Sequence, residues 1–272
     1  MSTDQTNAVV LQRIEVAPGL IILRVAPDEW ELSEFVPGQF AVLGLPPSAP
    51  RCRACDPCEP DEESRPGKLI KRAYSIASAS HWKQYMEFYI TLVRSGALTP
   101  RLFALDVGDR LWLGQKFTGS FTLDPVPEGK RVILMATGTG LAPYMSMMRT
   151  LLHDQSHEYV VIHGARHSWD LGYRSELSTM DRLSDKFIYI PSITRPAEET
   201  VPWTGLTGYL QNLWQDGSFA EIIGARPTPD DTHIFLCGNP SMIEAIMGIL
   251  EGEGFTEHKR RSPGTIHVEK YW

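Results

Sequence analysis

The stretch RVILMATGTGLAPYMSMMR, from Arg131 to Arg149, does most to predict the fold of this chain. Its apolar run, Val132 to Ala136, has the length and composition of a β-strand, and the residues after Pro143 form helices readily. Gly138 and Gly140 mark the turn between them. A strand, a glycine turn and a helix can aim backbone N–H groups at a phosphate, but ordinary strand-to-helix turns have a similar composition. The stretch alone leaves both interpretations open, since Pro143 also replaces the third glycine of the usual dinucleotide fingerprint.

After about residue 128, apolar strands alternate with helices. The predicted strands are Val132–Ala136, Tyr159–His163, Phe187–Ile190 and His233–Cys237, and the predicted helices are Met145–Leu152, Ser175–Leu183, Tyr209–Trp214 and Ser241–Leu250. This alternation predicts a doubly wound parallel sheet, which binds its ligands beyond the carboxyl ends of its strands. Pro125 to Gly129 has the composition of a linker, so we expect an α/β domain over residues 128–272.

The first half of the chain reads as short strands separated by turns. The predicted strands are Val9–Val16, Leu20–Val25, Phe40–Leu45, Ala73–Ile76, Met86–Val93 and Arg110–Leu113. Ala17-Pro18-Gly19 is a hairpin signal between the first two strands. One helix is expected to run to Leu105, with Thr99 as its N-cap and Pro100 at its first position. Many short strands with turns between them predict a closed antiparallel barrel or sandwich over residues 1–127.

Composition narrows the classes of function. The chain has 272 residues, 42% of them hydrophobic, which suits two domains with real cores. Its formal net charge of −7 argues against a nucleic-acid partner. No apolar run is long enough for a membrane helix, and the start MSTDQTNAVV lacks the pattern of a secretory signal. With four cysteines and no export signal, the chain is expected to be cytoplasmic, and without a membrane helix it is expected to have no membrane partner.

Six groups of short motifs occur in one order along the chain. They are Arg72-Ala73-Tyr74-Ser75, Gly96-x-Leu98-Thr99-Pro100-Arg101-Leu102, Gly108-Asp109 with Gly119-x-Phe121, Ala136-Thr137-Gly138-Thr139-Gly140, Cys237-Gly238-Asn239-Pro240-x-Met242, and the closing Val268-Glu269-Lys270-Tyr271-Trp272. Each motif is common by itself. In this order and at these spacings, the chain resembles the ferredoxin–NADP reductase family, specifically its shorter bacterial type. The resemblance covers nearly the whole chain and implies an antiparallel β-barrel domain that binds FAD, followed by a parallel-sheet domain that binds NADP and ends in an aromatic tail.

The resemblance implies an FAD site on the first domain. Arg72 is expected to meet the pyrophosphate, Tyr74 to stack on the isoalloxazine, and Ser75 to lie close to the reactive N5. These roles suit the residue types, although an edge strand with an exposed Arg would have the same sequence. The other residues expected around FAD are Ala73, Tyr89, Ile90, Thr91, Leu92, Ala97, Leu98, Thr99, Thr139, Tyr271 and Trp272. The family often has Lys where Ala97 stands, so backbone amides are expected to hold the phosphates.

Two arginines that follow adjacent predicted strands favour NADP over NAD. Arg166 and Arg195 suit a 2′-phosphate, whereas an NAD enzyme tends to place a carboxylate there for the ribose hydroxyls. Tyr209 replaces a third Arg of the family, and it could stack on the adenine. The other residues that the resemblance assigns to NADP are Gly138, Gly140, His167, Gly238, Asn239, Pro240 and Met242.

The resemblance also implies the chemistry. FAD would exchange a hydride with NADP(H) and single electrons with ferredoxin or flavodoxin. Ser75 is expected to hold N5, and Cys237 and Glu269 to position the nicotinamide or relay a proton. Because such carriers are acidic and this chain is acidic too, docking requires local basic patches. The candidate patches are Lys68, Lys71 and Arg72, and His258 to Arg261.

Residues 46–71 form a longer connection than the family usually has. The segment is rich in proline and charge, which indicates a surface loop. Cys52, Cys55 and Cys58 follow a C-x2-C-x2-C spacing, which suits zinc or an iron–sulfur cluster but is one ligand short. The remaining cysteine is Cys237. We therefore expect a flexible loop with surface thiols and no metal, with a metal site as the alternative.

Two other functions stay open at this point. A reductase of the same superfamily that reduces free flavin, ferric complexes or an oxygenase component would share both domains. A nucleotide-sensing subunit could keep the fold without turnover. The aromatic tail and the two arginines favour electron transfer linked to NADP.

Overall fold

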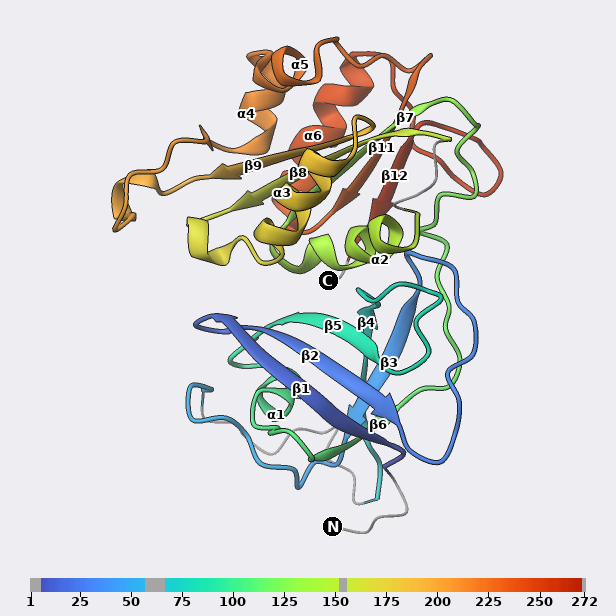
Figure 1. Ribbon diagram of the computed structural model, residues 1–272, viewed down its shortest axis with the longest axis vertical. Helices are drawn as coiled ribbons and strands as arrows, with labels where there is room; N and C mark the ends of the chain where they lie inside the picture. Colours follow the sequence, from blue (N-terminus) through green and yellow to red (C-terminus); the bar gives the residue numbers. More distant parts are fainter. Residues whose placement is uncertain (1–5, 57–66, 152–155, 271–272) are drawn as a thin grey trace. The chain divides into compact units, whose positions relative to one another are not determined.

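The computed structural model describes residues 6–56, 67–151 and 156–270 (Figure 1). The chain divides into two compact units. Unit 1 contains Met1–Thr122 and Met145–Thr150, and unit 2 contains Leu123–Tyr144 and Leu151–Trp272. Helix α2 (Ala142–Leu151) therefore starts in unit 2, and its middle belongs to unit 1.

Unit 1 is built on a six-stranded antiparallel sheet. Its strands are β1 (Ala8–Ala17), β2 (Leu20–Pro27), β3 (Phe40–Leu45), β4 (Ile70–Ser75), β5 (Met86–Thr91) and β6 (Arg110–Leu113), in the order β4-β3-β6-β1-β2-β5. Over the described residues, β4 and β5 are joined through one bridge, between Ile76 and Phe88. The sheet is thus barrel-like but open, and the prediction of a closed barrel is wrong in this respect, because β4 reaches β5 only with the residue just past its end.

The predicted hairpin joins β1 and β2. Ala17 pairs with Leu20, so Pro18-Gly19 forms a two-residue turn in which Gly19 has a φ of +80°. Glycine adopts that angle without a steric cost. Every second residue along the strands points into one core, as Ile21, Leu23 and Val25 do on β2.

Helix α1 (Thr99–Leu102) is shorter than predicted, and its cap differs. Leu98 is the N-cap, and Pro100 is the second helical residue. The Thr99 hydroxyl instead donates to the carbonyl of Val93 and accepts from its N–H, each at 3.0 Å. The predicted Thr99 cap is wrong because this hydroxyl closes the preceding turn.

A buried carboxylate is the main electrostatic feature of unit 1. Glu87 on β5 is 1% exposed. Arg24 from β2 donates to its Oε2, and Arg149 from the part of α2 in unit 1 donates to its Oε1, each at 2.6 Å. Arg149 also donates to the carbonyl of Ala77 at 2.8 Å. A buried charge is tolerated only with such partners, so these two arginines hold β2, β5 and α2 to one point of unit 1.

Unit 2 contains the predicted parallel sheet. Its strands are β7 (Arg131–Thr137), β8 (Glu158–Ala165), β9 (Phe187–Ile193), β10 (Leu206–Thr207), β11 (Thr232–Cys237) and β12 (Ile266–Glu269), in the order β10-β9-β8-β7-β11-β12. All neighbouring pairs are parallel. The helices that belong wholly to unit 2 are α3 (Arg174–Leu183), α4 (Leu210–Gln215), α5 (Ser218–Ile223) and α6 (Pro240–Gly252).

The sheet of unit 2 is covered on both faces. One core contains alternate residues of β7, such as Ile133 and Met135, with the apolar faces of α4, α5 and α6. Figure 1 shows α3 on the opposite face from α6. The predicted doubly wound architecture is therefore confirmed. The short elements β10 and α5 were not predicted, because two strand residues and a six-residue helix give too little periodicity to detect.

Within the described residues, every helix is too short or too polar to cross a membrane.

Buried histidines lie within the sheet of unit 2. His163 on β8 is fully buried, and burial lowers its pKa to about 3. Its Nδ1 lies 3.2 Å from the Tyr189 hydroxyl. Burial also lowers the pKa of His267 on β12 to about 3, and the neighbouring His233 and His258 contribute to that shift. The His267 ring stacks on Phe235 at 4.2 Å between ring centroids. Both imidazoles are thus neutral at pH 7.

We expect the folded protein to lose stability as the pH falls from about 6.5 towards 4. In that window His163 and His267 bind protons in the unfolded chain but stay neutral in the folded protein. Each histidine therefore lowers the free energy of unfolding by about 1.4 kcal/mol per pH unit. Urea unfolding at a series of pH values measures the slope. His163→Gln and His267→Gln should each flatten it, whereas Ser95→Ala, which changes an exposed side chain that does not titrate, should not. Equal slopes in all four proteins would contradict the assignment.

Candidate functional site

The carboxyl ends of β7 and β11 come into direct backbone contact. Ala136 pairs with Cys237, and the residues beyond them pack without room for side chains. A Cβ on Gly140 would lie 2.3 Å from the Cys237 carbonyl oxygen, and one on Gly238 would lie 2.3 Å from the hydroxyl oxygen of Thr137. Gly140 is therefore required by packing. Gly138 has open space around it and a φ of +55°, so the expected close approach of an anion rests on this glycine and stays a prediction.

The chain after β11 is fixed by two further hydrogen bonds. The N–H of Asn239 donates to the Thr137 hydroxyl at 2.8 Å. The side-chain oxygen of Asn239 accepts from the N–H of Ser241 at 2.8 Å and so caps α6. Pro240 opens the helix, and Met242 is buried in the core of unit 2. Asn239 and Met242 thus shape this edge from within, and their expected contacts with NADP stay predictions.

Cys237 and Glu269 face each other at the same edge. They are register partners on β11 and β12, and the Cys237 thiol lies 3.9 Å from Oε2 of Glu269. Beside them is the buried Tyr144, whose hydroxyl donates to the Met135 carbonyl at 3.2 Å. Burial raises the pKa of Tyr144, and the charges of Cys237 and Glu269 add to the rise. A thiol, a carboxylate and a neutral phenol are therefore gathered where a proton could be held.

The two arginines of the predicted 2′-phosphate site lie next to each other. Arg166 follows β8, and Arg195 comes two residues after β9. The N–H of Arg195 donates to the carbonyl of Arg166 at 2.9 Å, and the N–H of Thr194 donates to that of Ala165 at 3.0 Å. The pairing of β8 with β9 thus continues past the strands and sets the two guanidinium groups side by side, both more than half exposed.

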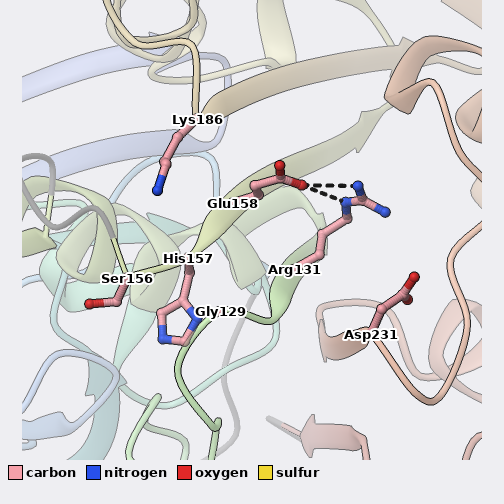
Figure 2. Close-up of a pocket in the computed structure, with 7 residues that line it drawn as sticks. All are labelled: Gly129, Arg131, Ser156, His157, Glu158, Lys186 and Asp231. Atoms are coloured by element: carbon pink, nitrogen blue, oxygen red, sulfur yellow. Dashed lines mark hydrogen bonds and ion pairs between the residues drawn. The ribbon is translucent and has the colours of Figure 1, made fainter.

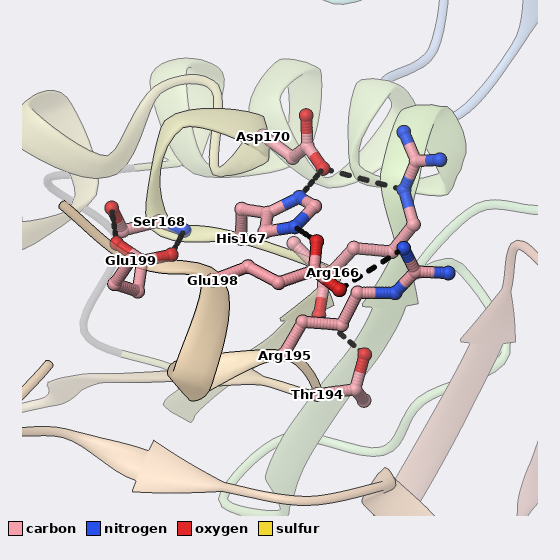
Figure 3. A network of polar contacts seen from close by, with 9 residues as sticks. Arg166, His167, Ser168, Asp170, Thr194, Arg195, Glu198 and Glu199 are labelled. Carbon is pink, nitrogen blue, oxygen red and sulfur yellow. Dashed lines mark hydrogen bonds and ion pairs between the residues drawn. The ribbon is translucent and has the colours of Figure 1, made fainter.

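Carboxylates already contact these cations (Figure 3). Asp170 Oδ2 lies 3.4 Å from Nε of Arg166 and 3.2 Å from Nδ1 of His167. Glu198 Oε2 accepts from Nε2 of His167 at 2.7 Å, and its Oε1 lies 3.5 Å from Nη1 of Arg195. The hydrogen bond to Glu198, followed by that to Asp170, raises the pKa of His167. The site thus alternates two guanidinium groups and an imidazole with two carboxylates.

Aromatic rings flank this charged cluster. Trp169 stacks on the His167 ring, with 4.4 Å between ring centroids and 9° between planes. Tyr209 is 62% exposed and stands at the N-cap of α4, after Gly208 with its φ of +134°. Ser192 fixes this turn by donating to the Gly208 carbonyl at 3.0 Å. An exposed ring held on a rigid turn has the form that adenine stacking requires.

In unit 1, the residues expected to hold FAD lie on β4, β5 and the α1 turn. Exposure falls along β4 from Arg72 and Ala73, which are exposed, through Tyr74 to Ser75, which is buried. The bridge between Ile76 and Phe88 brings this end of β4 beside β5. On β5 and the turns around it, Tyr89, Ile90 and Leu98 are buried, Leu92, Ala97 and Thr99 are half-buried, and Thr91 is exposed.

The chemistry of this donor set suits a flavin nucleotide. Tyr74, Leu92 and Ala97 are apolar residues that pack against the core of unit 1 with one side uncovered. Burial raises the pKa of Tyr74, so its ring stays uncharged. The guanidinium of Arg72 suits a phosphate, and the ring of Tyr74 suits stacking on a flat heterocycle. The hydroxyl of Ser75 suits a hydrogen bond to a ring nitrogen.

Two arginines hold the α1 turn from one side. Nη1 of Arg51 donates to the Gly96 carbonyl at 3.0 Å, and Nη1 of Arg101 donates to the Ala97 carbonyl. In a planar trans peptide the N–H points away from the carbonyl. The N–H groups of Ala97 and Leu98 therefore point away from the guanidinium groups, and the expected binding of a phosphate by these N–H groups stays a prediction.

The described part of the cysteine loop is held by hydrogen bonds to the α1 turn and the segment just before it, while residues 57–66 of the loop lie outside the described residues. The N–H of Cys52 donates to the Pro100 carbonyl at 2.9 Å, and that of Asp56 to the Arg94 carbonyl at 3.1 Å. Arg94 also pairs with Asp56 at 3.3 Å. The flexibility expected for the loop as a whole stays a prediction. Cys52 and Cys55 are free and half-buried.

Some predicted residues lie outside the described part of the chain. Cys58, Tyr271 and Trp272 are among them. Over the remaining residues, no group of His, Cys, Asp and Glu has the arrangement of a metal site. Thr139 is half-buried on the 3-10 turn after β7, and its expected contact with FAD stays a prediction.

A separate pocket of about 240 Å³ opens at the amino ends of the strands of unit 2 (Figure 2). Arg131 at its wall is bound to Glu158 at 2.9 Å. The predicted NADP residues lie at the opposite, carboxyl edge of the sheet. Because doubly wound sheets bind nucleotides at that carboxyl edge, we assign the candidate site there.

Sequence reasoning missed four residues of these sites. Asp170 was detectable, since it stands three and four residues after His167 and Arg166. Glu198, Tyr144 and Arg51 reach their partners from separate elements, and no sequence spacing indicates those contacts.

Comparison with known proteins places the chain among reductases. The sequence profile described as "Oxidoreductase NAD-binding domain" matches residues 134–247. The flavodoxin/ferredoxin–NADP reductase of Buchnera aphidicola subsp. Baizongia pistaciae (strain Bp) is 31% identical over 243 residues, or 89% of each chain. The ferredoxin–NADP reductase of Azotobacter vinelandii is 31% identical over 247 residues, 87% of this chain and 86% of that one.

A solved structure has the same fold. The ferredoxin NADP+ reductase from Neisseria gonorrhoeae, crystallised with bound FAD and NADP, superposes with a TM-score of 0.81 over 98% of both chains. At 24% identity this likeness speaks for the fold alone.

Gly140→Ala should destabilise the protein by about 2 to 3 kcal/mol, because the added methyl meets a backbone oxygen and β7 must separate from β11. Gly138→Ala, two residues away in open space, should cost only the strain of its left-handed angle, about 1 kcal/mol. Chemical unfolding measures both free energies. If Gly140→Ala were as mild as Gly138→Ala, the close contact would not constrain the turn.

Proposed function

This chain belongs to the flavodoxin/ferredoxin–NADP reductase family and is an oxidoreductase, and from that premise we propose that it transfers a hydride between NADP(H) and FAD and single electrons between FAD and a ferredoxin or flavodoxin. The observation that carries the NADP assignment is the pair Arg166 and Arg195, held side by side at the carboxyl ends of β8 and β9. Two guanidinium groups there suit a phosphate on the ribose.

Bound FAD would supply the electron chemistry. The residues of unit 1 would bind and orient it: Arg72 and the N–H groups of Ala97 and Leu98 would neutralise phosphate, and Tyr74 would cover the ring. Ser75, which is buried at the end of β4, would offer a hydrogen bond to N5. In unit 2, Cys237 and Glu269, whose Sγ and Oε2 atoms lie 3.9 Å apart, would position the nicotinamide or relay a proton.

Anaerobic titration of the FAD-loaded protein with NADPH and with NADH tests the proposal. We expect NADPH to bleach the flavin absorbance at lower concentration than NADH. Arg195→Gln should raise the KM for NADPH about tenfold, because roughly one charge-assisted contact with the phosphate is lost. The KM for NADH and both kcat values should stay unchanged.

Arg182→Gln is the matched control, since Arg182 lies in the last turn of α3 and carries the same charge. It should change neither KM. A flavin that neither nucleotide bleaches would instead support the nucleotide-sensing alternative, and equal use of both nucleotides would remove the NADP preference.

The carrier is proposed to dock on a basic surface of unit 1. Lys68, Lys71 and Arg72 are exposed at the start of β4, and Nζ of Lys71 lies 3.4 Å from the centre of the Trp112 ring. Lys68, Lys71 and Trp112 line a groove of about 550 Å³. In the second candidate patch, Lys259 is paired with Glu257 at 2.8 Å, which reduces the charge it offers to an acidic partner.

Reduction of a flavodoxin or ferredoxin should slow steeply as salt rises, because screening weakens the encounter of opposite charges. Lys71→Ser should lower the rate at low salt about threefold and flatten the salt dependence. Stopped-flow kinetics measures both. Lys259→Ser removes the same charge from the other patch and should have little effect, so the reverse result would reject docking at β4.

A further inference from the structure

The carboxylates at the predicted 2′-phosphate site differ in how firmly they are held. Asp170 belongs to the same short turn as its partners, is 14% exposed, and contacts both Arg166 and His167. Glu198 is 54% exposed and comes from a separate 3-10 turn, Pro196–Glu198. Asp170 is therefore a fixed part of the cluster, whereas Glu198 can swing out into solvent by rotating its own side chain.

Glu198 uses the donors that a phosphate would need. Its Oε2 accepts a hydrogen bond from Nε2 of His167 at 2.7 Å, and its Oε1 lies 3.5 Å from Nη1 of Arg195. A phosphate monoester dianion, like a carboxylate, forms short charge-assisted bonds with such donors. Both ligands cannot occupy the same N–H groups, so binding of one requires departure of the other.

We propose that Glu198 is an intramolecular competitor of the nucleotide 2′-phosphate, and that it sets the affinity and specificity of this site by holding His167 and Arg195 until the phosphate displaces it. The inference rests on the proposed NADP-linked function. Displacing Glu198 costs free energy, which weakens the affinity for 2′-phosphorylated nucleotides. The affinity for nucleotides without that phosphate is unaffected. The discrimination between NADP and NAD is therefore lower than Arg166, His167 and Arg195 would give without Glu198.

The matched control is the next residue. Glu199 carries the same charge on the same segment, but it accepts from the N–H and hydroxyl of Ser168, at 2.8 and 2.6 Å. Figure 3 shows its carboxylate directed to Ser168, away from the arginines. A general effect of removing one negative charge would therefore appear equally in Glu199→Gln.

Calorimetric titration of the FAD-loaded protein with adenosine 2′,5′-bisphosphate and with adenosine 5′-monophosphate tests the proposal, because the two probes differ only in the 2′-phosphate. Glu198→Gln should bind the bisphosphate about three- to tenfold more tightly than the unmodified protein. The bisphosphate then no longer has to break the contacts of Glu198 with His167 and Arg195. Its affinity for the monophosphate should not change, and Glu199→Gln should match the unmodified protein with both probes.

A spectroscopic measurement reports the contact itself. Because Glu198 contributes most to raising the pKa of His167, the His167 ring should titrate at lower pH in Glu198→Gln when followed by proton NMR. In Glu199→Gln it should titrate closer to its position in the unmodified protein. An unshifted His167 titration in Glu198→Gln would overturn the proposal.

Three binding results would also overturn it: unchanged or weaker bisphosphate binding by Glu198→Gln, equal tightening in Glu199→Gln, or weaker monophosphate binding, which would make Glu198 a ligand of the ribose. If neither the unmodified protein nor Glu198→Gln bound the bisphosphate, the anion site and the proposal would both fail. Flavin bleaching by NADPH or NADH judges the proposed function separately, since hydride transfer does not require Glu198.

Discussion

The contact between the backbones of β7 and β11 is the constraint on which the nucleotide-facing edge of unit 2 depends. Gly140 and Gly238 each fit against a backbone or hydroxyl oxygen of the other strand's end, at distances that admit no side chain. That approach places the Asn239 N–H on Thr137 and starts α6 at a fixed point. With β7 and β11 locked, β12 carries its carboxylate to the thiol of β11. The positions of the reactive groups thus follow from packing of the strands.

The charges at the other end of this edge follow a different logic. Arg166 and Arg195 are aligned by the backbone, and their two exposed guanidinium groups would repel each other if left alone, beside a His167 side chain that is only 10% exposed. Asp170 and Glu198 between them lower that repulsion. A rule that reads arginine as NADP and carboxylate as NAD is therefore ambiguous here, because both residue types are present. The two carboxylates differ in mobility, since Asp170 is held within its turn whereas the side chain of Glu198 can rotate into solvent.

Much of this arrangement could be predicted from residue patterns. The period-2 alternation of the first half and the strand–helix alternation of the second gave the sheets, and the resemblance built on Arg72–Ser75, Cys237 and Glu269 to the reductase family is confirmed. The Thr99 cap and the closed barrel were predicted wrongly, since a hydroxyl can close a turn as well as cap a helix, and closure depends on how two edge strands cross. Contacts such as Glu198 to His167 join segments whose separation in sequence carries no signal.

Two departures from the family pattern meet at the α1 turn and offset each other. Ala97 stands where the family often has a lysine, which removes a positive charge from the expected phosphate site. The long connection before β4, the other departure, brings Arg51 to the Gly96 carbonyl, and Arg101 takes the next carbonyl in line. Two guanidinium groups therefore lie behind this peptide segment, and they turn its N–H groups outward. A phosphate at this turn would meet oriented N–H dipoles with positive charge behind them, and in that case Arg51 from the extra loop, together with Arg101, would offset the missing lysine through backbone geometry.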